Sequence, residues 1–325
     1  MLTARGVVRR SLPFAALLIL ASALSLSVGP SGLGLADLIS GSALARTVIL
    51  GLRLPRLIAG VAAGLSLSAC GVVFQGVLGN PLAEPFVLGV AGGAAAAACL
   101  AMLAGLPPLA CGVAAFAGAA LTTLAVLGLG RRGGQVSAAM LLLAGIVANT
   151  FFAALIMLAT SLASEERLYN IILWLYGDLG RPGLAGALAA LAAGLAATIL
   201  FVARSRRLNL LAAGGEDAAD LGLDVGRERL VFYLAASLAT GAVVATCGLI
   251  GFVGLIVPHM VRLALGSDHR ALIPAAALAG AAFLVLADLA ARSLFAPLEL
   301  PVGIVTAFLG APFFALQLRR RGLTW

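Results

Sequence analysis

The most polar stretch of this sequence is GGEDAADLGLDVGRER, residues Gly214–Arg229, in which seven of sixteen residues are charged. Glu216 and Asp217 come early, where carboxylates stabilise the positive N-terminal end of a helix dipole. Gly222 follows at a spacing typical of a helix end. The pattern predicts a short helix from Gly214 to Gly222, which is either a solvated connection or a polar surface for a protein partner.

Side chains that could carry covalent, metal or nucleotide chemistry are scarce. The chain has no lysine, so it lacks the GxxxxGK[ST] loop that cradles ATP phosphates. His259 and His269 have no carboxylate or cysteine at the spacing of a metal site, and no residue stands in a nucleophile motif. The cysteines lie inside apolar runs, which indicates packing roles: Cys70, Cys99, Cys111 and Cys247. The sequence predicts neither an enzyme nor a bound metal or cofactor.

The rest of the chain is strongly apolar. Of its 325 residues 62% are hydrophobic and 10% are charged, and the mean hydropathy is +1.13. A soluble domain has about 25% charged residues, so this composition predicts a membrane protein. The net charge is +8, but the arginines stand in small groups between apolar runs. That distribution is typical of loops that orient membrane helices, and it argues against nucleic-acid binding.

Stretches without Asp, Glu or Arg mark the membrane spans, each of which needs about 20 apolar residues. Two runs are too long for one span, and they break at GLPP (Gly105–Pro108) and at CGLIGFVG (Cys247–Gly254). Splitting them gives ten spans in a single domain, residues 1–325. The runs are Ser11–Ala36, Leu57–Ala83, Pro85–Gly130, Gly133–Ser164, Pro182–Ala203, Leu230–Val261, Ala271–Ala287 and Leu300–Leu318.

Arginine placement predicts that both termini are cytoplasmic. Three arginines precede the first span and three follow the last, so the number of spans is even by the positive-inside rule. With ten spans, 15 arginines lie inside and six outside, namely Arg46, Arg53, Arg56, Arg167, Arg181 and Arg292. A cleaved signal peptide is the alternative for the first apolar run.

Ionisable residues deep in a span usually mark ion pathways, and Asp288 is the clearest of them here. Arg292 follows four residues later, so the two can pair on one helix face. One acidic residue that is already paired and lies near the end of a span does not provide the ion pathway that an ion-coupled pump needs. The energy for transport is therefore expected from another chain.

Seven segments, in order along nearly the whole chain, resemble the FecCD-type permeases of ABC importers. They are LRLPR (Leu52–Arg56), FQGVLGNPLAEPFVLGVAGGA (Phe74–Ala94), LLLAG (Leu141–Gly145), GGEDAADLGLDV (Gly214–Val225), GLIGFVGLIVPHMVRLALGSDHR (Gly248–Arg270), ADLAAR (Ala287–Arg292) and ELPVGIVTAFLGAPFFALQLRR (Glu299–Arg320).

The resemblance implies an all-α permease in the inner membrane, built as a homodimer of ten-span subunits. Two cytoplasmic ATPase subunits, which carry ATP and Mg, and one periplasmic binding protein are the implied partners. Residues 208–229 match the segment that couples to the ATPase. The implied coupling residues are Glu216, Asp217, Ala218, Asp220, Leu221, Gly222 and Leu223.

The resemblance also implies roles at the two membrane surfaces. Arg53, Arg56 and Arg292 match arginines that meet glutamates of the binding protein as exposed charge pairs; ordinary interfacial arginines are the alternative. A cytoplasmic gate is implied at two segments, and in the second of them alanine largely replaces the family's hydroxyl side chains. The gate residues are Asn80, Pro81, Leu82, Ser137, Ala138 and Ala139.

Three functions therefore compete. An ABC importer permease accounts for the motifs, with an iron chelate (siderophore or haem) as cargo and cobalamin as the alternative cargo. An ion-coupled secondary transporter would need inverted repeats and charges at the membrane midplane, which the sequence does not clearly contain. An intramembrane enzyme would need a catalytic set, and none is evident.

Overall fold

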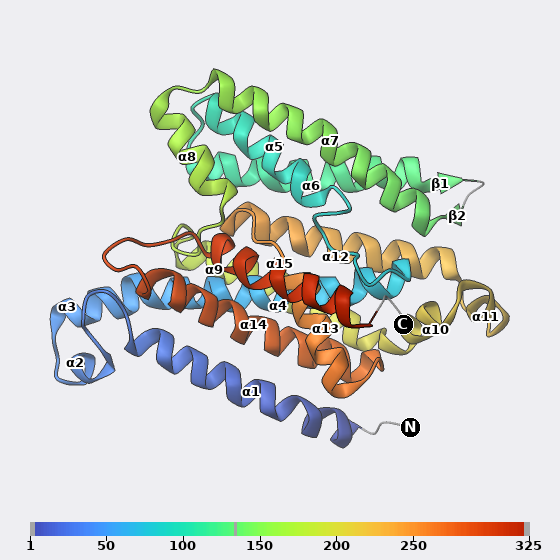
Figure 1. Cartoon of the computed structure of the whole chain (residues 1–325), viewed down its shortest axis with the longest axis horizontal. Coiled ribbons are helices and arrows are strands. Elements are labelled where there is room, and N and C mark those ends of the chain that lie inside the picture. Colours follow the sequence, from blue (N-terminus) through green and yellow to red (C-terminus); the bar gives the residue numbers. More distant parts are fainter. Residues whose placement is uncertain (1–3, 133–134, 322–325) are drawn as a thin grey trace.

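The computed structural model describes residues 4–132 and 135–321, and most of this part of the chain is helical (Figure 1). Helices are expected because the bilayer core offers no hydrogen-bond partner for a free backbone group. Two-residue strands β1 (Arg131–Arg132) and β2 (Gln135–Val136) form a small antiparallel pair. The helices are α1 (Ala4–Ser27), α2 (Leu35–Ile39), α3 (Ala43–Arg46), the π-helix η1 (Thr47–Arg53), α4 (Leu54–Leu78), α5 (Val90–Leu103), α6 (Pro108–Gly130), α7 (Ala138–Leu162), α8 (Glu165–Leu175), α9 (Leu184–Ala203), α10 (Ser205–Ala213), α11 (Gly215–Asp220), α12 (Val225–Cys247), α13 (Val253–Leu265), α14 (His269–Ser293) and α15 (Val302–Arg321).

The prediction of about ten spans in an all-helical bundle is confirmed within the described ranges. Seven helical stretches are long and apolar enough to cross a membrane, and three further apolar helices are shorter. Both predicted breaks are present. The GLPP break separates α5 from α6, and the glycine-rich break separates α12 from α13.

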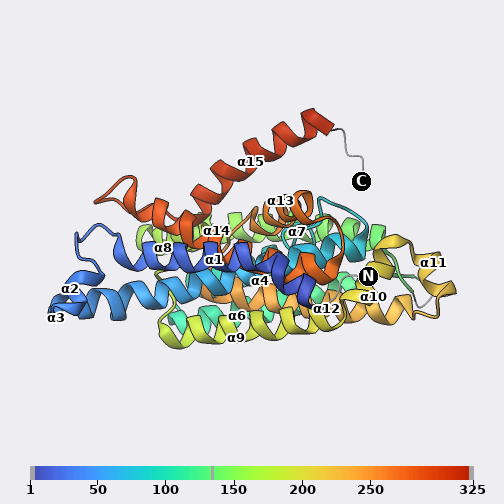
Figure 2. The same ribbon diagram turned by 90° about the horizontal axis from the view of Figure 1, so that it is seen from below.

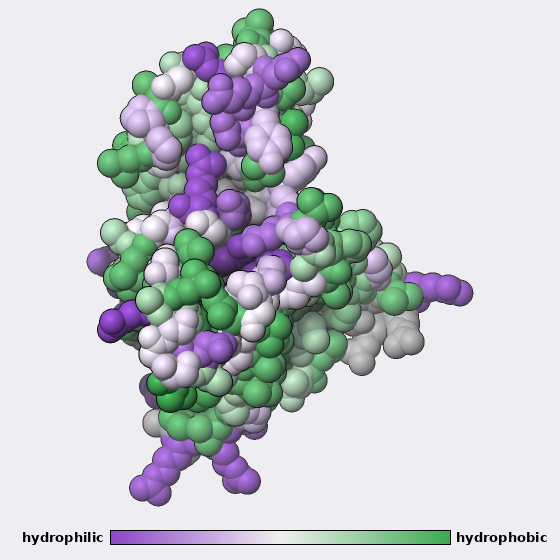
Figure 3. Space-filling view, turned by 90° about the vertical axis from the view of Figure 1, so that its left-hand side faces the viewer, coloured by the Kyte–Doolittle hydropathy of each residue, from purple (hydrophilic) through white to green (hydrophobic). Residues whose placement is uncertain are grey.

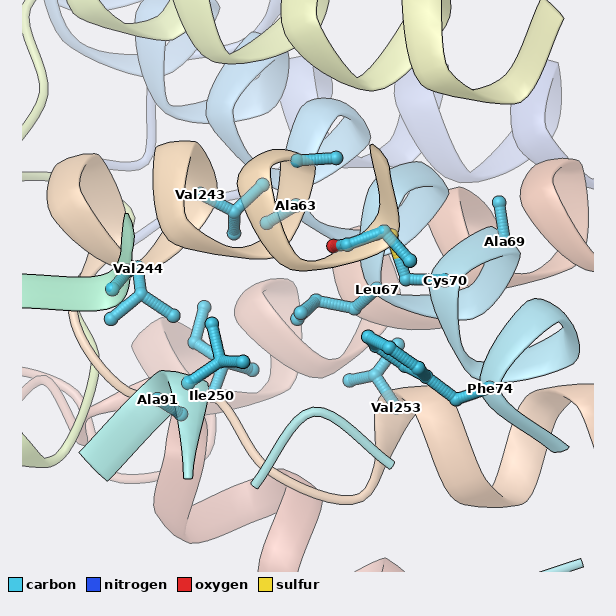
Figure 4. Close-up of a cluster of buried hydrophobic side chains, with 14 of the residues drawn as sticks. Ala63, Leu67, Ala69, Cys70, Phe74, Ala91, Val243, Val244, Ile250 and Val253 are labelled. Atoms are coloured by element: carbon cyan, nitrogen blue, oxygen red, sulfur yellow. The ribbon is translucent and has the colours of Figure 1, made fainter. Parts of the chain in front are cut away.

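Helix α4 forms the centre of the bundle and is buried along most of its length. It packs against α9, α12, α13 and α14. Leu67, Cys70 and Phe74 of α4 lie in the same buried cluster as Val243 of α12 and Val253 of α13 (Figure 4). All four cysteines are buried and free, in agreement with the packing role predicted for them.

Two glycines of α4 allow neighbouring backbones to come unusually close. A Cβ on Gly64 would lie 2.2 Å from the carbonyl oxygen of Gly280 in α14, and one on Gly71 would lie 1.9 Å from that of Gly254 in α13. Small residues at membrane-helix contacts permit this approach. The short α13 is thereby held directly against the central helix.

The two ends of the bundle carry different elements (Figures 1 and 2). Helices α2, α3 and α8 lie at one end, which we call the α8 end. Helices α10 and α11 and the β1–β2 pair lie at the other, the α11 end. Helix α1 begins toward the α11 end and α15 ends toward it, as an even number of spans requires.

Candidate functional site

A charged cluster at the α8 end joins the start of α4 to the end of α14 and the loop that follows it, more than 230 positions away in the sequence. Arg56, in the first turn of α4, donates from Nε to Asp288 Oδ1 at 2.9 Å and to Oδ2 at 3.1 Å. Its Nη1 donates to Glu299 Oε2 at 2.6 Å. Arg292 Nε lies 3.6 Å from Asp288 Oδ2. The predicted Asp288–Arg292 pair is confirmed, and Asp288 in fact lies between two arginines.

The other guanidinium contacts of this cluster hold the end of α1. Arg53 donates from Nη1 to the carbonyl of Leu26 at 2.6 Å and from Nη2 to Ser31 Oγ at 3.0 Å. Arg292 donates from Nη2 to the carbonyl of Ser25 and to its hydroxyl. The last carbonyls of a helix have no partner within the helix and attract cations. Both arginines therefore act as a cap on the C-terminal end of α1.

The three predicted docking arginines differ in how much of each side chain is exposed. In the chain alone Arg53 is 5% exposed and Arg292 is 3% exposed, so both side chains are largely covered. The Arg56 side chain is 15% exposed and its partner Glu299 is 49% exposed. Hydrophilic side chains nevertheless gather over the α8 end (Figure 3). A docking role for the three arginines stays a prediction, and Arg56 is the one best placed for it.

The segment between α4 and α5 turns back into the bundle. Asn149 of α7 donates from Nδ2 to the carbonyl of Phe86 at 2.6 Å, and a Cβ on Gly145 would lie 2.6 Å from the carbonyl oxygen of Val87. Asn149 is eleven residues into α7, which is about 16 Å at 1.5 Å per residue. Helix α5 therefore starts at depth, which explains why it has only 14 residues.

The two predicted gate segments both adjoin this region. Asn80 Oδ1 accepts from the backbone N–H of Leu82 at 2.9 Å, which forms a tight turn ahead of the returning segment. Pro81 is half-buried in that turn. Ser137 precedes α7 and donates its N–H to the carbonyl of Gly130 at 3.1 Å; Ala138 and Ala139 open the helix.

The gate role of these six residues stays a prediction. Sequence reasoning missed the Asn149 bond to the returning segment. A polar residue in the middle of an apolar run, one helical turn after Gly145, is the signal that could have revealed it.

At the α11 end, the polar stretch forms the predicted short helix. Helix α11 spans Gly215–Asp220, and Gly222 has φ +81° just beyond it. Ala218 is buried, whereas Leu221 is 70% exposed. Asp217 and Asp220 are exposed and Leu223 is half-buried; the side chain of Glu216 lies outside the described part of the chain. The helix therefore presents carboxylates outward, and its C-cap residue Leu221 presents one large apolar side chain.

A buried glutamate ties this region to α12. Glu228 is 3% exposed, and its Oε1 accepts from Arg204 Nη1 at 3.0 Å and from Arg207 Nη1 at 2.5 Å. A buried charge is costly unless it is paired. The pairing therefore fixes the junction between α9 and α10 relative to the start of α12.

Comparisons with known proteins agree with this arrangement. Residues 17–320 match the FecCD transport family. The chain is 40% identical to the hemin transport system permease protein HmuU of Yersinia pestis over 84% of this chain and 83% of the relative. It is 39% identical to the vitamin B12 import system permease protein BtuC of Escherichia coli O157:H7 over 98% of this chain and 97% of the relative. Among solved structures, an inward-facing putative metal-chelate type ABC transporter superposes with a TM-score of 0.88 at 30% identity, covering 96% of this chain and 99% of that one.

Proposed function

The chain belongs to the FecCD transport family of ABC importer permeases. We propose that its cargo is a metal chelate, and an iron chelate (haem or a ferric siderophore) is the favoured candidate. The observation that carries this proposal is the similarity along most of the chain to a haem permease, a cobalamin permease and a metal-chelate type transporter. These cargoes share a metal ion held in a large organic ligand. Cobalamin is the second candidate because the match to its permease covers 98% of this chain.

Uptake of metal into liposomes tests the cargo. The chain is reconstituted with its ATPase and binding protein, and ferric siderophore, haemin and cyanocobalamin are supplied separately with ATP inside. Accumulation of iron is the expected result, measured as metal retained after washing. Accumulation of cobalt alone would make cobalamin the cargo, and a complex that hydrolyses ATP but accumulates none of the three would overturn the proposal of a metal chelate.

The ATPase partner is proposed to dock on α11. A soluble protein can bind an exposed polar helix. Most of the affinity of such an interface comes from a few side chains that become buried in it. Leu221 fits that role because it is 70% exposed beside two exposed carboxylates. ATP and Mg would be bound by the partner, since this chain has no lysine for a P-loop.

A second copy of the chain is proposed to pack beside α15. This helix leaves the body of the bundle (Figure 2), and Phe308, Leu309 and Leu316 are 77%, 52% and 58% exposed. The binding protein is proposed to dock on the α8 end, where Arg56 and Glu299 remain partly accessible. One binding protein and two ATPase subunits would then serve a pair of permeases.

The α11 end is proposed to face the cytoplasm, with both termini on that side. Single cysteines replacing Arg5 and Arg319, which are exposed near the two ends, should resist a membrane-impermeant thiol reagent in intact cells. A cysteine replacing Glu166 in α8 should react. The four native cysteines are buried and give a low background. Labelling at only one terminus would contradict the even number of spans.

A further inference from the structure

Helix α10, which leads into the coupling helix α11, is fastened to the start of α14 through one amide side chain. Asn209 Oδ1 accepts from the backbone N–H of His269 at 2.9 Å and lies 2.6 Å from His269 Nδ1. Because an amide oxygen can only accept, Nδ1 carries the imidazole proton. Asn209 Nδ2 donates to Asp268 Oδ1 at 3.0 Å. One half-buried side chain thus holds two consecutive residues of another helix, and we call this contact the Asn209 clamp.

The α14 side of the Asn209 clamp is itself fixed. Asp268 is the N-cap of α14 and accepts from the backbone N–H of Arg270 at 3.0 Å. It also forms a two-pronged ion pair with the Arg270 guanidinium. Hydrogen bonds from Arg270, with a smaller one from Asn209, hold the pKa of Asp268 well below its usual range. The carboxylate therefore stays ionised and keeps accepting from Asn209 at every physiological pH.

The Asn209 clamp is packed against the central helix. The His269 residue is 3% exposed and Leu208 is fully buried. A Cβ on Gly76 of α4 would lie 3.0 Å from both His269 Nε2 and Leu208 Cδ1, so the imidazole and the leucine fill the space that this glycine leaves. Helix α10 therefore has little room to slide past the start of α14.

Helix α14 runs from the Asn209 clamp to the charged cluster at the α8 end. Asp268 and Asp288 are twenty residues apart, or about 30 Å along a helix. The helix is largely buried against α1 and α4. At its far end Asp288 binds Arg56, and Arg292 binds the end of α1. One helix thus contacts the Asn209 clamp at its start and the charged cluster at its other end.

We propose that Asn209 is a positioning residue for coupling: the clamp passes movement of α11 to α14, which carries it to the binding-protein side of the membrane. This inference rests on the proposed function, because it takes α11 as the ATPase dock. The surface of α11 that binds the ATPase does not include Asn209. A variant at Asn209 can therefore still bind the ATPase while it loses the coupling to α14.

The test uses the full complex carrying Asn209→Ala. We expect the ATPase subunits to co-purify and basal ATP hydrolysis to stay within twofold of wild type, about RT ln 2 in free energy. Stimulation of hydrolysis by the loaded binding protein and metal taken up per ATP should fall roughly fivefold or more, the lower end of typical coupling between sites. Full stimulation in Asn209→Ala, or loss of its ATPase subunits, would overturn the inference.

A matched control lies one helical turn earlier. Ser205 is a buried polar residue of α10, but its hydroxyl donates at 2.7 Å to the carbonyl of Val202 in the preceding turn. Ser205→Ala should keep full stimulation. The double variant Asn209→Ala/Asp268→Ala should lose less coupling than the sum of the two single losses, because both substitutions remove the shared Asn209–Asp268 bond; fully additive losses would contradict the clamp. Failure of the proposed function looks different, since the wild-type complex itself would then not couple hydrolysis to uptake.

Discussion

Replacing Leu221 by aspartate is expected to strip the ATPase subunits from the purified complex and to abolish uptake. Burial of an aliphatic side chain in the interface contributes about 1.5–3 kcal/mol, which corresponds to roughly 10- to 150-fold in affinity. The variant loses this contribution. In addition, the carboxylate of the new aspartate would have to lose its water to be buried in the interface, which is unfavourable unless it is paired. Because Leu221 is 70% exposed in the chain alone, the permease itself should insert and fold as before. Co-purification on an affinity-tagged permease measures the loss.

The control for Leu221→Asp is Arg131→Ala. Arg131 is exposed on the β1–β2 pair at the same end of the molecule, outside the proposed dock. This variant should retain the ATPase. If Leu221→Asp kept stoichiometric ATPase and wild-type transport, α11 would be a solvated connection and the coupling surface would lie elsewhere.

Replacing Asp288 by alanine is expected to cause the largest loss of folded permease. The carboxylate is 5% exposed and lies between Arg56 and Arg292, so its removal leaves the buried Arg292 guanidinium without its counter-charge and takes from Arg56 one of its two acidic partners. Breaking a buried pair in this way costs about 3–5 kcal/mol, a large part of a typical total stability of about 5–15 kcal/mol. The measurement is the yield and apparent melting temperature of monodisperse protein in detergent.

Glu299→Gln provides a control on the same arginine. Glu299 also binds Arg56, but its side chain is 49% exposed, and exposed ion pairs contribute about 0–1 kcal/mol. Its yield and melting temperature should stay near wild type. Equal losses in the two variants would show that burial does not determine the strength of this cluster.

The bundle could be predicted from the sequence because the bilayer imposes simple rules. Apolar runs of sufficient length must form spans, and the breaks at Gly105–Pro108 and Cys247–Gly254 follow from residues that interrupt helices. The short helix α11 was predictable for the same kind of reason, since its charges and Gly222 are local signals. The Asp288–Arg292 pair was also predictable, because both residues lie on one face of one helix.

Contacts between distant segments could not be predicted in this way. Arg56 and Asp288 are 232 positions apart, and no local pattern brings them together. Burial of Arg53 and Arg292 depends on where α1 ends in space, which hydropathy does not specify. The returning segment before α5 likewise depends on Asn149 and Gly145 of another helix. These features are set by tertiary packing, and they determine which arginine of the α8 end can reach a partner.

The most direct measurement of the central claim is uptake by the complete complex in liposomes, with ATP and ion gradients varied independently. An ABC importer permease should accumulate metal chelate only when ATP is present, and ionophores that collapse proton and sodium gradients should leave the initial rate unchanged. An ion-coupled transporter should behave in the opposite way. Uptake that persists without ATP, or that collapses with the ion gradient while ATP is present, would contradict the account.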